Sequence, residues 1–97
     1  MSGLPAFRKL CALEQLELNR AYPRLLPLLL RRGLAPEDAL AVAYNATLLY
    51  RVLERTPPFG RPADLLAQYS LDEIAALCET YRRVERGELE YGGRTEP

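Results

Sequence analysis

Two acidic residues near the N-terminus, Glu14 and Glu17, come closest in type and spacing to catalytic chemistry. A spacing of three residues places their carboxylates on adjacent turns of a helix, where a buried acid could transfer a proton or form an ion pair. The sequence contains no histidine, the commonest general base. We therefore predict that the protein is not an enzyme. Glu14 should mark a bend or early end of its helix, or pair with an arginine at the margin of the helix face.

The two cysteines, Cys11 and Cys78, are far apart in the sequence. Without histidine, they do not match the usual spacings of zinc ligands. The sequence also contains neither a glycine-rich phosphate loop nor a nucleophile elbow. We expect both cysteines to be reduced thiols in the core, and we expect no metal and no cofactor.

The net charge is zero, because the sequence contains thirteen basic and thirteen acidic residues. This balance argues against nucleic acid or an anionic membrane as the partner. The most apolar run, residues 25–30, is too short to cross a bilayer. Residues 1–20 lack the uninterrupted apolar region of a signal peptide, so we expect a cytoplasmic protein. Twelve of the basic residues are arginine, a bias that indicates GC-rich coding and suggests a bacterial source. Because small helical accessory proteins are frequent in phages and bacterial mobile elements, we expect an origin of that kind.

The stretch from Pro36 to Arg55 is the one segment long and apolar enough to form a central helix. At about 100° per residue, seven of its apolar side chains fall within one arc. These seven are Ala39, Val42, Ala43, Ala46, Leu49, Tyr50 and Leu53. The chain length suits one domain. We predict an all-α fold, a compact single-domain bundle of four to five short-looped helices around a central helix at about 36–55.

Shorter helices are expected on either side of that centre, at about 4–19, 23–32, 62–68 and 70–86. Pro27 should give the second of them a 3₁₀-like start, with regular helix only from about Leu26, and its leucines should be mostly buried. Ser70 and Glu73 form a capping box before the last helix. Residues 1–87 should form the helical domain and residues 88–97 a flexible C-terminal tail.

A second apolar line on the central helix is the main candidate for partner binding. Leu40, Tyr44, Leu48 and Val52 recur every four residues opposite the first arc, and could form an exposed ridge flanked by Arg51 and Arg55. The alternative is that residues 25–30 cover this ridge within the monomer. A proline-rich connector at 56–62 presents two further candidates, Phe59 and Arg61, although Phe59 could instead fold inward over the core.

These patterns predict a small non-enzymatic protein-protein interaction or assembly module that binds a protein partner or a second copy of itself. The alternative is a DNA-binding protein that uses residues 39–55, which are similar to a helix-turn-helix. That similarity fails at the turn, because residues 42–46 contain no glycine and leave too few positions for a bend. Balanced charge argues against it as well, since phosphate contacts supply most of the affinity for DNA.

Overall fold

The structure is a computed structural model that describes residues 6–54 and 58–88. Within these ranges the regular elements are all helices, which confirms the predicted all-α fold. They are α1 (Ala12–Ala21), the 3₁₀ helix η1 (Tyr22–Leu25), α2 (Leu26–Arg31), α3 (Pro36–Val52), α4 (Ala63–Gln68) and α5 (Leu71–Glu85).

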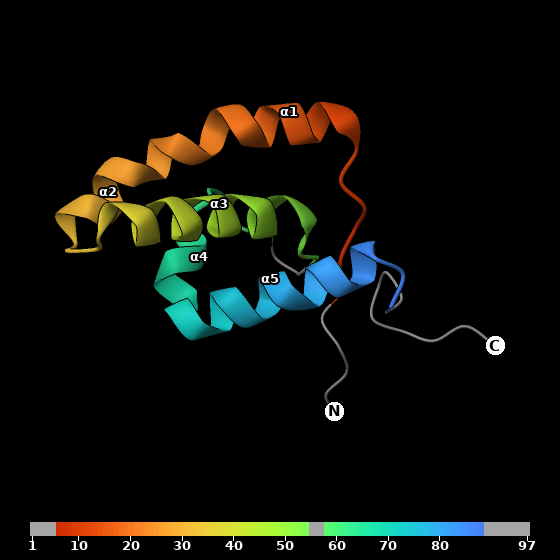
Figure 1. The fold of residues 1–97 in the computed structure, drawn as a ribbon. Helices are drawn as coiled ribbons and strands as arrows, with labels where there is room; N and C mark the ends of the chain where they lie inside the picture. Colours follow the sequence, from red (N-terminus) through yellow and green to blue (C-terminus); the bar gives the residue numbers. More distant parts are fainter. Residues whose placement is uncertain (1–5, 55–57, 89–97) are drawn as a thin grey trace.

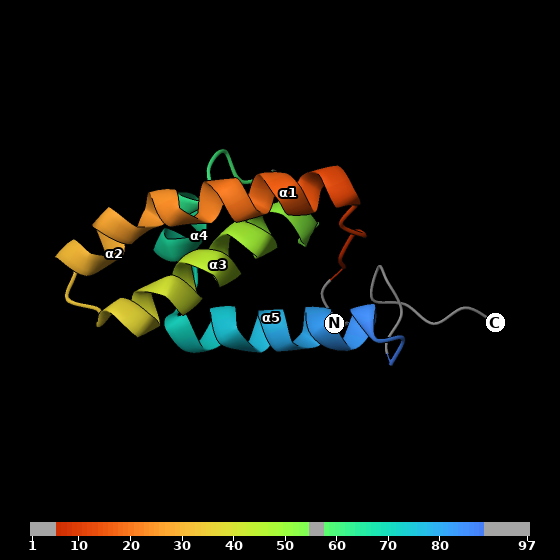
Figure 2. The same ribbon diagram turned by 45° about the horizontal axis from the view of Figure 1, so that its top comes forward.

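Helix α3 lies at the centre of the bundle, as predicted, and contacts every other helix. Figure 1 shows α1, η1 and α2 following one another as a nearly continuous rod along one side of α3, while α5 runs along the opposite side. The tilted view in Figure 2 keeps the same order, with α4 behind α3. The rod and α5 therefore leave their outer faces to solvent, and α3 supplies the shared core.

The start of α3 follows the expected pattern, but its end does not. Pro36 occupies the first turn together with two acidic residues that favour the helix dipole. The helix ends at Val52 instead of Arg55, because Leu53 is extended and forms an antiparallel bridge with Phe7. The amide of Arg8 donates to the Val52 carbonyl over 2.8 Å, and the amide of Glu54 donates to the Ala6 carbonyl over 2.9 Å.

That bridge also corrects the predicted first helix, which was expected to span residues 4–19. Residues 6–10 are not helical, and α1 begins at Ala12. Phe7 is buried through the bridge, and its ring meets Tyr81 edge-on with centroids 5.4 Å apart. The prediction assumed that residues 4–19 form one local helix, but the backbone of residues 6–8 hydrogen-bonds to the end of α3 instead.

The second and last helices follow their local signals closely. Regular helix in the rod begins at Leu26 after a 3₁₀ turn, as Pro27 predicts. In α5 the amide of Glu73 donates to Ser70 Oγ over 3.0 Å, and the Ser70 amide donates to Glu73 Oε1 over 2.8 Å. The capping box is therefore confirmed. Leu71, the first residue of α5, is half exposed.

Two clusters of buried side chains form the core. The larger cluster surrounds the C-terminal half of α3 and contains Phe7, Leu18, Leu48, Leu49, Val52, Leu65, Ile74, Cys78, Tyr81 and Val84. The smaller cluster lies where α2 crosses the N-terminal half of α3 and contains Leu25, Leu29, Ala39, Ala43 and Ala46. The two halves of the central helix are thus packed by different means.

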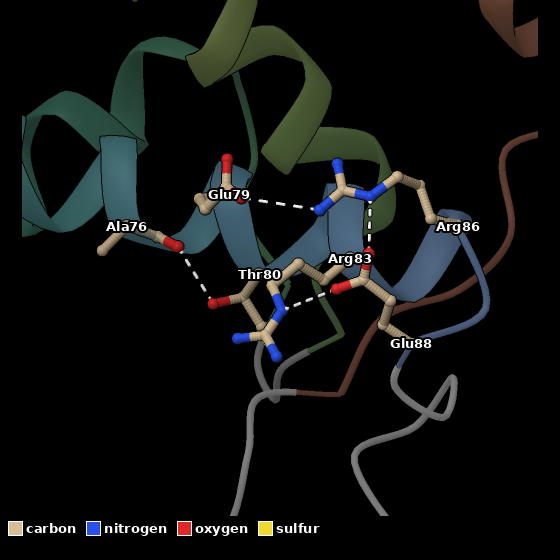
Figure 3. Close-up of polar contacts among 6 residues, drawn as sticks. All are labelled: Ala76, Glu79, Thr80, Arg83, Arg86 and Glu88. Carbon is tan, nitrogen blue, oxygen red and sulfur yellow. Dashed lines mark hydrogen bonds and ion pairs between the residues drawn. The ribbon is translucent and has the colours of Figure 1, made fainter.

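Arginine and glutamate side chains form a group of ion pairs at the C-terminal end of α5. Figure 3 shows the Glu88 carboxylate between two arginines, with Arg83 Nε at 3.1 Å and Arg86 Nε at 2.9 Å. Arg86 also lies 3.7 Å from Glu79. These hydrogen bonds lower the pKa of Glu88. Of the predicted flexible tail, residues 89–97 lie outside the described residues, and Glu88 itself is bonded to the helix.

Candidate functional site

The continuous exposed ridge predicted on α3 is wrong. Leu40 is 45% exposed and Tyr44 is half-buried, but Leu48 is only 4% exposed and Val52 is fully buried. Leu48 and Val52 belong to the larger core cluster, where side chains from residues 7–18 and from α5 cover them. The predicted alternative, in which residues 25–30 cover the ridge, is also wrong for Leu48 and Val52. Leu25 and Leu29 pack against the alanines of α3 instead.

Leu40 and Tyr44 line a shallow hollow between the rod, α3 and α5. Its volume is about 500 Å³, and its other lining residues are Tyr22, Ala41, Asn45 and Arg82. The rings of Tyr22 and Tyr44 meet edge-on at 5.3 Å, and Gln15 Nε2 donates to the Tyr44 hydroxyl over 3.3 Å. Arg82 Nη2 donates to Asn45 Oδ1 over 3.3 Å. Most polar groups here already have partners inside the protein.

Two other residues predicted to bind a partner, Arg51 and Phe59, line a second hollow of about 560 Å³. Arg51 Nη1 forms an ion pair with Glu17 Oε1 at 3.0 Å. Phe59 packs against the larger core cluster and meets the Tyr69 ring edge-on at 6.1 Å, which confirms the alternative that it folds inward. Arg61 is exposed and pairs with Asp64 at 3.2 Å. Arg55 lies outside the described residues.

The carboxylates singled out for chemistry are engaged in separate ion pairs. Glu14 accepts hydrogen bonds from the Arg8 guanidinium, including Nη1 at 3.2 Å, and from the Cys11 amide at 3.1 Å. These bonds, Arg8 first, lower the pKa of Glu14 to about 2. Glu14 is therefore ionised at neutral pH and caps the start of α1. The predicted pairing of Glu14 with an arginine is confirmed.

The expected core position is right for one cysteine and wrong for the other. Cys78 is buried, and desolvation raises the pKa of its thiol to about 12, so it stays protonated. Cys11 is exposed, because the chain turns there from extended backbone into α1 and the residue takes the N-cap position. Among the described residues, histidine, cysteine, aspartate and glutamate side chains nowhere gather in a group of three that could hold a metal.

The most exposed large apolar side chains are on α1, where sequence reasoning missed them. Leu13 is 71% exposed and Leu16 is 63% exposed. The side chain that α1 buries fully is Leu18, which lies about 140° around the helix from Leu13 at 100° per residue. A helical wheel drawn for the predicted helix 4–19 puts Leu13 and Leu18 in the same broad apolar half. A narrower stripe centred on Leu18 would have turned Leu13 outward.

Charge is unevenly distributed even though the chain as a whole is neutral. Residues 18–35 include four arginines, Arg20, Arg24, Arg31 and Arg32, and no acidic residue. All four are exposed, and none forms an ion pair with a described residue. The arginines at the end of α5 differ, since Arg83 and Arg86 have carboxylate partners (Figure 3). Residues 18–35, from the end of α1 through α2, thus form a cationic stretch of the surface.

Residues 39–52 all lie within α3, which runs without interruption from Pro36 to Val52. A helix-turn-helix needs two helices separated by a bend. The described part of the 39–55 segment does not supply that geometry.

Comparisons with protein-family models, with curated proteins and with solved structures found no match for this chain. The described residues also contain no helix long and apolar enough to cross a membrane.

Proposed function

We propose that this protein is a non-enzymatic interaction module that binds a protein partner through the outer face of α1. The observation that carries the proposal is the exposure of Leu13 and Leu16, at 71% and 63%. Their spacing of three residues makes them neighbours on the helix surface. Arg20, four residues beyond Leu16, is exposed beside them. Exposed apolar patches bordered by polar residues mark protein interaction sites, and arginine is enriched at interfaces.

The fold itself does not account for these two leucines. Helix α1 packs on α3 through the fully buried Leu18, supported by half-buried Gln15 and by Tyr22 just beyond its end. Removing a leucine side chain from water contributes roughly 1.5–3 kcal/mol when its burial is complete. Covering both by a partner would therefore supply a useful share of a binding free energy.

A non-enzymatic role is supported by the state of the candidate acids. Glu14 is tied to Arg8 and to the start of α1, and Glu17 is tied to Arg51. The depressed pKa of Glu14 keeps its carboxylate ionised, which is the opposite of what a proton donor needs at neutral pH. Glu14 thus fixes the start of α1, and Glu17 links α1 to α3.

The proposal places this module in the cytoplasm of a bacterium, as an accessory protein of a phage or mobile element. The arginine-to-lysine ratio of twelve to one supports the bacterial source through GC-rich coding. The short chain and its balanced charge suit a small adaptor that docks on another protein.

A photocrosslinking amino acid at position 16 tests the proposal in cells of the native host. We expect a covalent adduct with a defined partner, identified by intact mass, and we expect Leu13→Ser in the same chain to abolish it. The matched control carries the crosslinker at Ala75, an exposed position on α5, where no adduct should form. Absence of any adduct at position 16, or identical adducts at both positions, would contradict the proposal.

A further inference from the structure

The outer face of α1 is apolar toward its start and cationic toward its end, which defines the chemistry of the partner it suits. We propose that this partner docks through an acidic amphipathic helix, whose apolar side chains cover Leu13 and Leu16 and whose carboxylates bind Arg20 and Arg24. The inference rests on the proposed function, because it concerns the same face of α1. In Figure 1 this face belongs to the rod, and α3 lies between the rod and α5.

Leu13, Leu16 and Arg20 point to one side of α1. At 100° per residue they fall within an arc of about 60°, and all three are exposed. Leu18, the residue that α1 buries fully, lies at least about 140° around the helix from each of them. The three side chains therefore point away from the core and share one surface.

Arg24 continues this surface beyond the end of α1. It is exposed and follows Arg20 by four residues, in the 3₁₀ helix η1 that extends the rod. A rise of about 1.5–2 Å per residue places the backbones of these two arginines roughly 6–8 Å apart. Leu13, Leu16, Arg20 and Arg24 thus form a row of two leucines followed by two arginines, within about 20 Å of the rod.

The two arginines of this row have no internal counter-charge. Arg20 and Arg24 form no ion pair with any residue in 6–54 or 58–88. Glu17, the nearest acid along α1, turns toward α3 and pairs there with Arg51 at 3.0 Å. Residues 18–35 contain no other acid that could take its place. Both guanidinium groups are therefore available to carboxylates of a partner.

An acidic helix matches the row in charge and in spacing. Arginine binds carboxylates through paired, charge-assisted hydrogen bonds, which favours aspartate or glutamate opposite Arg20 and Arg24. Residues three or four apart on a helix share one face. A partner helix can therefore place two carboxylates opposite the arginines and apolar side chains opposite Leu13 and Leu16. A basic partner surface would be repelled at the arginines.

An anionic membrane suits the row less well than an acidic helix does. A helix that lies in a membrane interface inserts its apolar face and keeps its charges on the opposite side. In the rod the apolar face is already occupied, because Leu18, Leu25 and Leu29 are buried in the two core clusters. On α1 only Leu13 and Leu16 remain for a bilayer, and they lie on the same side as Arg20.

Fluorescence anisotropy with the purified full chain and labelled helical peptides tests this inference. The acidic probe carries a leucine pair followed by glutamates four residues apart. One counterpart has lysine at each glutamate position, and another has serine at each leucine position. The acidic probe should bind roughly tenfold more tightly than either counterpart, since each loses contacts with one half of the row. Its Kd should rise between about 0.1 M and about 1 M salt, because salt screens the ion pairs.

The variant Arg20→Glu/Arg24→Glu should weaken binding of the acidic probe by roughly tenfold or more, because attraction becomes repulsion. The matched control Arg83→Glu/Arg86→Glu makes the same charge change on α5 and should leave the Kd unchanged. Circular dichroism confirms that each variant is folded. The inference is overturned if the lysine peptide binds as tightly as the acidic probe, if the Kd does not depend on salt, or if the control weakens binding equally.

Phosphatidylglycerol vesicles and duplex DNA serve as rival anionic probes in the same assay. Binding of either one through Arg20 and Arg24, without binding of the acidic peptide, would overturn the inference in favour of a membrane surface or a nucleic acid.

Crosslinking separates failure of this inference from failure of the proposed function. An adduct at position 16 that persists unchanged in Arg20→Glu/Arg24→Glu would retain the α1 face as a protein-binding surface and reject the acidic partner. No adduct at position 16, together with no binding of the acidic peptide, would reject both.

Discussion

The two halves of helix α3 are packed in different ways. Toward its C-terminus, Leu48, Leu49 and Val52 interlock with large side chains from residues 7–18, α4 and α5. Toward its N-terminus, the small side chains of Ala39 and Ala43 pack against Leu25 and Leu29 of the rod. The C-terminal half of α3 buries large side chains of its own. The N-terminal half buries mainly alanines.

The two halves of α3 should therefore contribute unequally to the free energy of unfolding. Burying a large aliphatic side chain contributes roughly 1.5–3 kcal/mol, whereas an alanine contributes much less. The C-terminal half should therefore unfold only with the whole domain, and the N-terminal half should open more readily. The exposed Leu30 and Leu40 belong to the more weakly packed half.

The largest effect is expected from Leu49→Asp in the C-terminal half of α3. Leu49 is fully buried, and an unpaired carboxylate there costs several kcal/mol, comparable with the roughly 5–15 kcal/mol that holds a domain together. The variant should lose its cooperative thermal transition in circular dichroism. A melt close to that of wild type would show that this half does not carry the core.

A smaller loss of stability is expected from Ala43→Leu in the N-terminal half of α3, because this substitution overpacks the core. The added methylene groups would force the rod away from α3 at a cost of about 1–3 kcal/mol. Leu49→Ala in the C-terminal half should cost about 2–5 kcal/mol by leaving a cavity. Urea denaturation measures both. Stabilisation by Ala43→Leu would show unfilled space beside the alanines and would contradict the difference in packing between the two halves of α3.

A pH-dependent effect is expected from Glu14, which caps α1 beside the C-terminal half of α3. Its pKa is about 2 in the folded protein and roughly 4.3 in an unfolded chain. Because the folded pKa is the lower one, the carboxylate stabilises the fold at neutral pH. This contribution is lost as the pH falls from about 4.3 toward 2. Thermal melts of wild type and Glu14→Gln should differ near pH 7 and converge near pH 2, and a constant difference would contradict the ion pair with Arg8.

The smallest effect on stability is expected from Leu13→Ser/Leu16→Ser on the outer face of α1. Both side chains are largely exposed, so the free energy of unfolding should change by no more than about 0.5 kcal/mol for each surface substitution. Leu18→Ala on the buried face of the same helix should cost about 2–5 kcal/mol. Equal losses for the two faces, measured in urea, would mean that α1 packs through its leucines in solution.

The sequence predicted the features that local residues determine. Pro27 located the change from 3₁₀ to regular helix, and Ser70 with Glu73 located the start of α5. The proline and acids after Ala35 located the start of α3. Caps and prolines act through the backbone of their own turn, so they can be interpreted without knowing the rest of the fold.

Features that depend on distant residues could not be predicted in the same way. The end of α3 depends on hydrogen bonds with residues 6–8, more than forty positions away in the chain. The burial of Leu48 and Val52 depends on which elements cover them, and a helical wheel carries no information about neighbours. The exposure of Leu13 was missed for the same reason, because the packing of Leu18 in the core decides which side of α1 faces inward.

Native-state hydrogen exchange along α3 tests the central comparison most directly. Amides from Thr47 to Val52 should exchange only through global unfolding, with the same dependence on denaturant as the whole domain. Amides from Leu40 to Ala43 should exchange through local openings of lower free energy. Uniform protection along the helix, with one denaturant dependence throughout, would contradict the account.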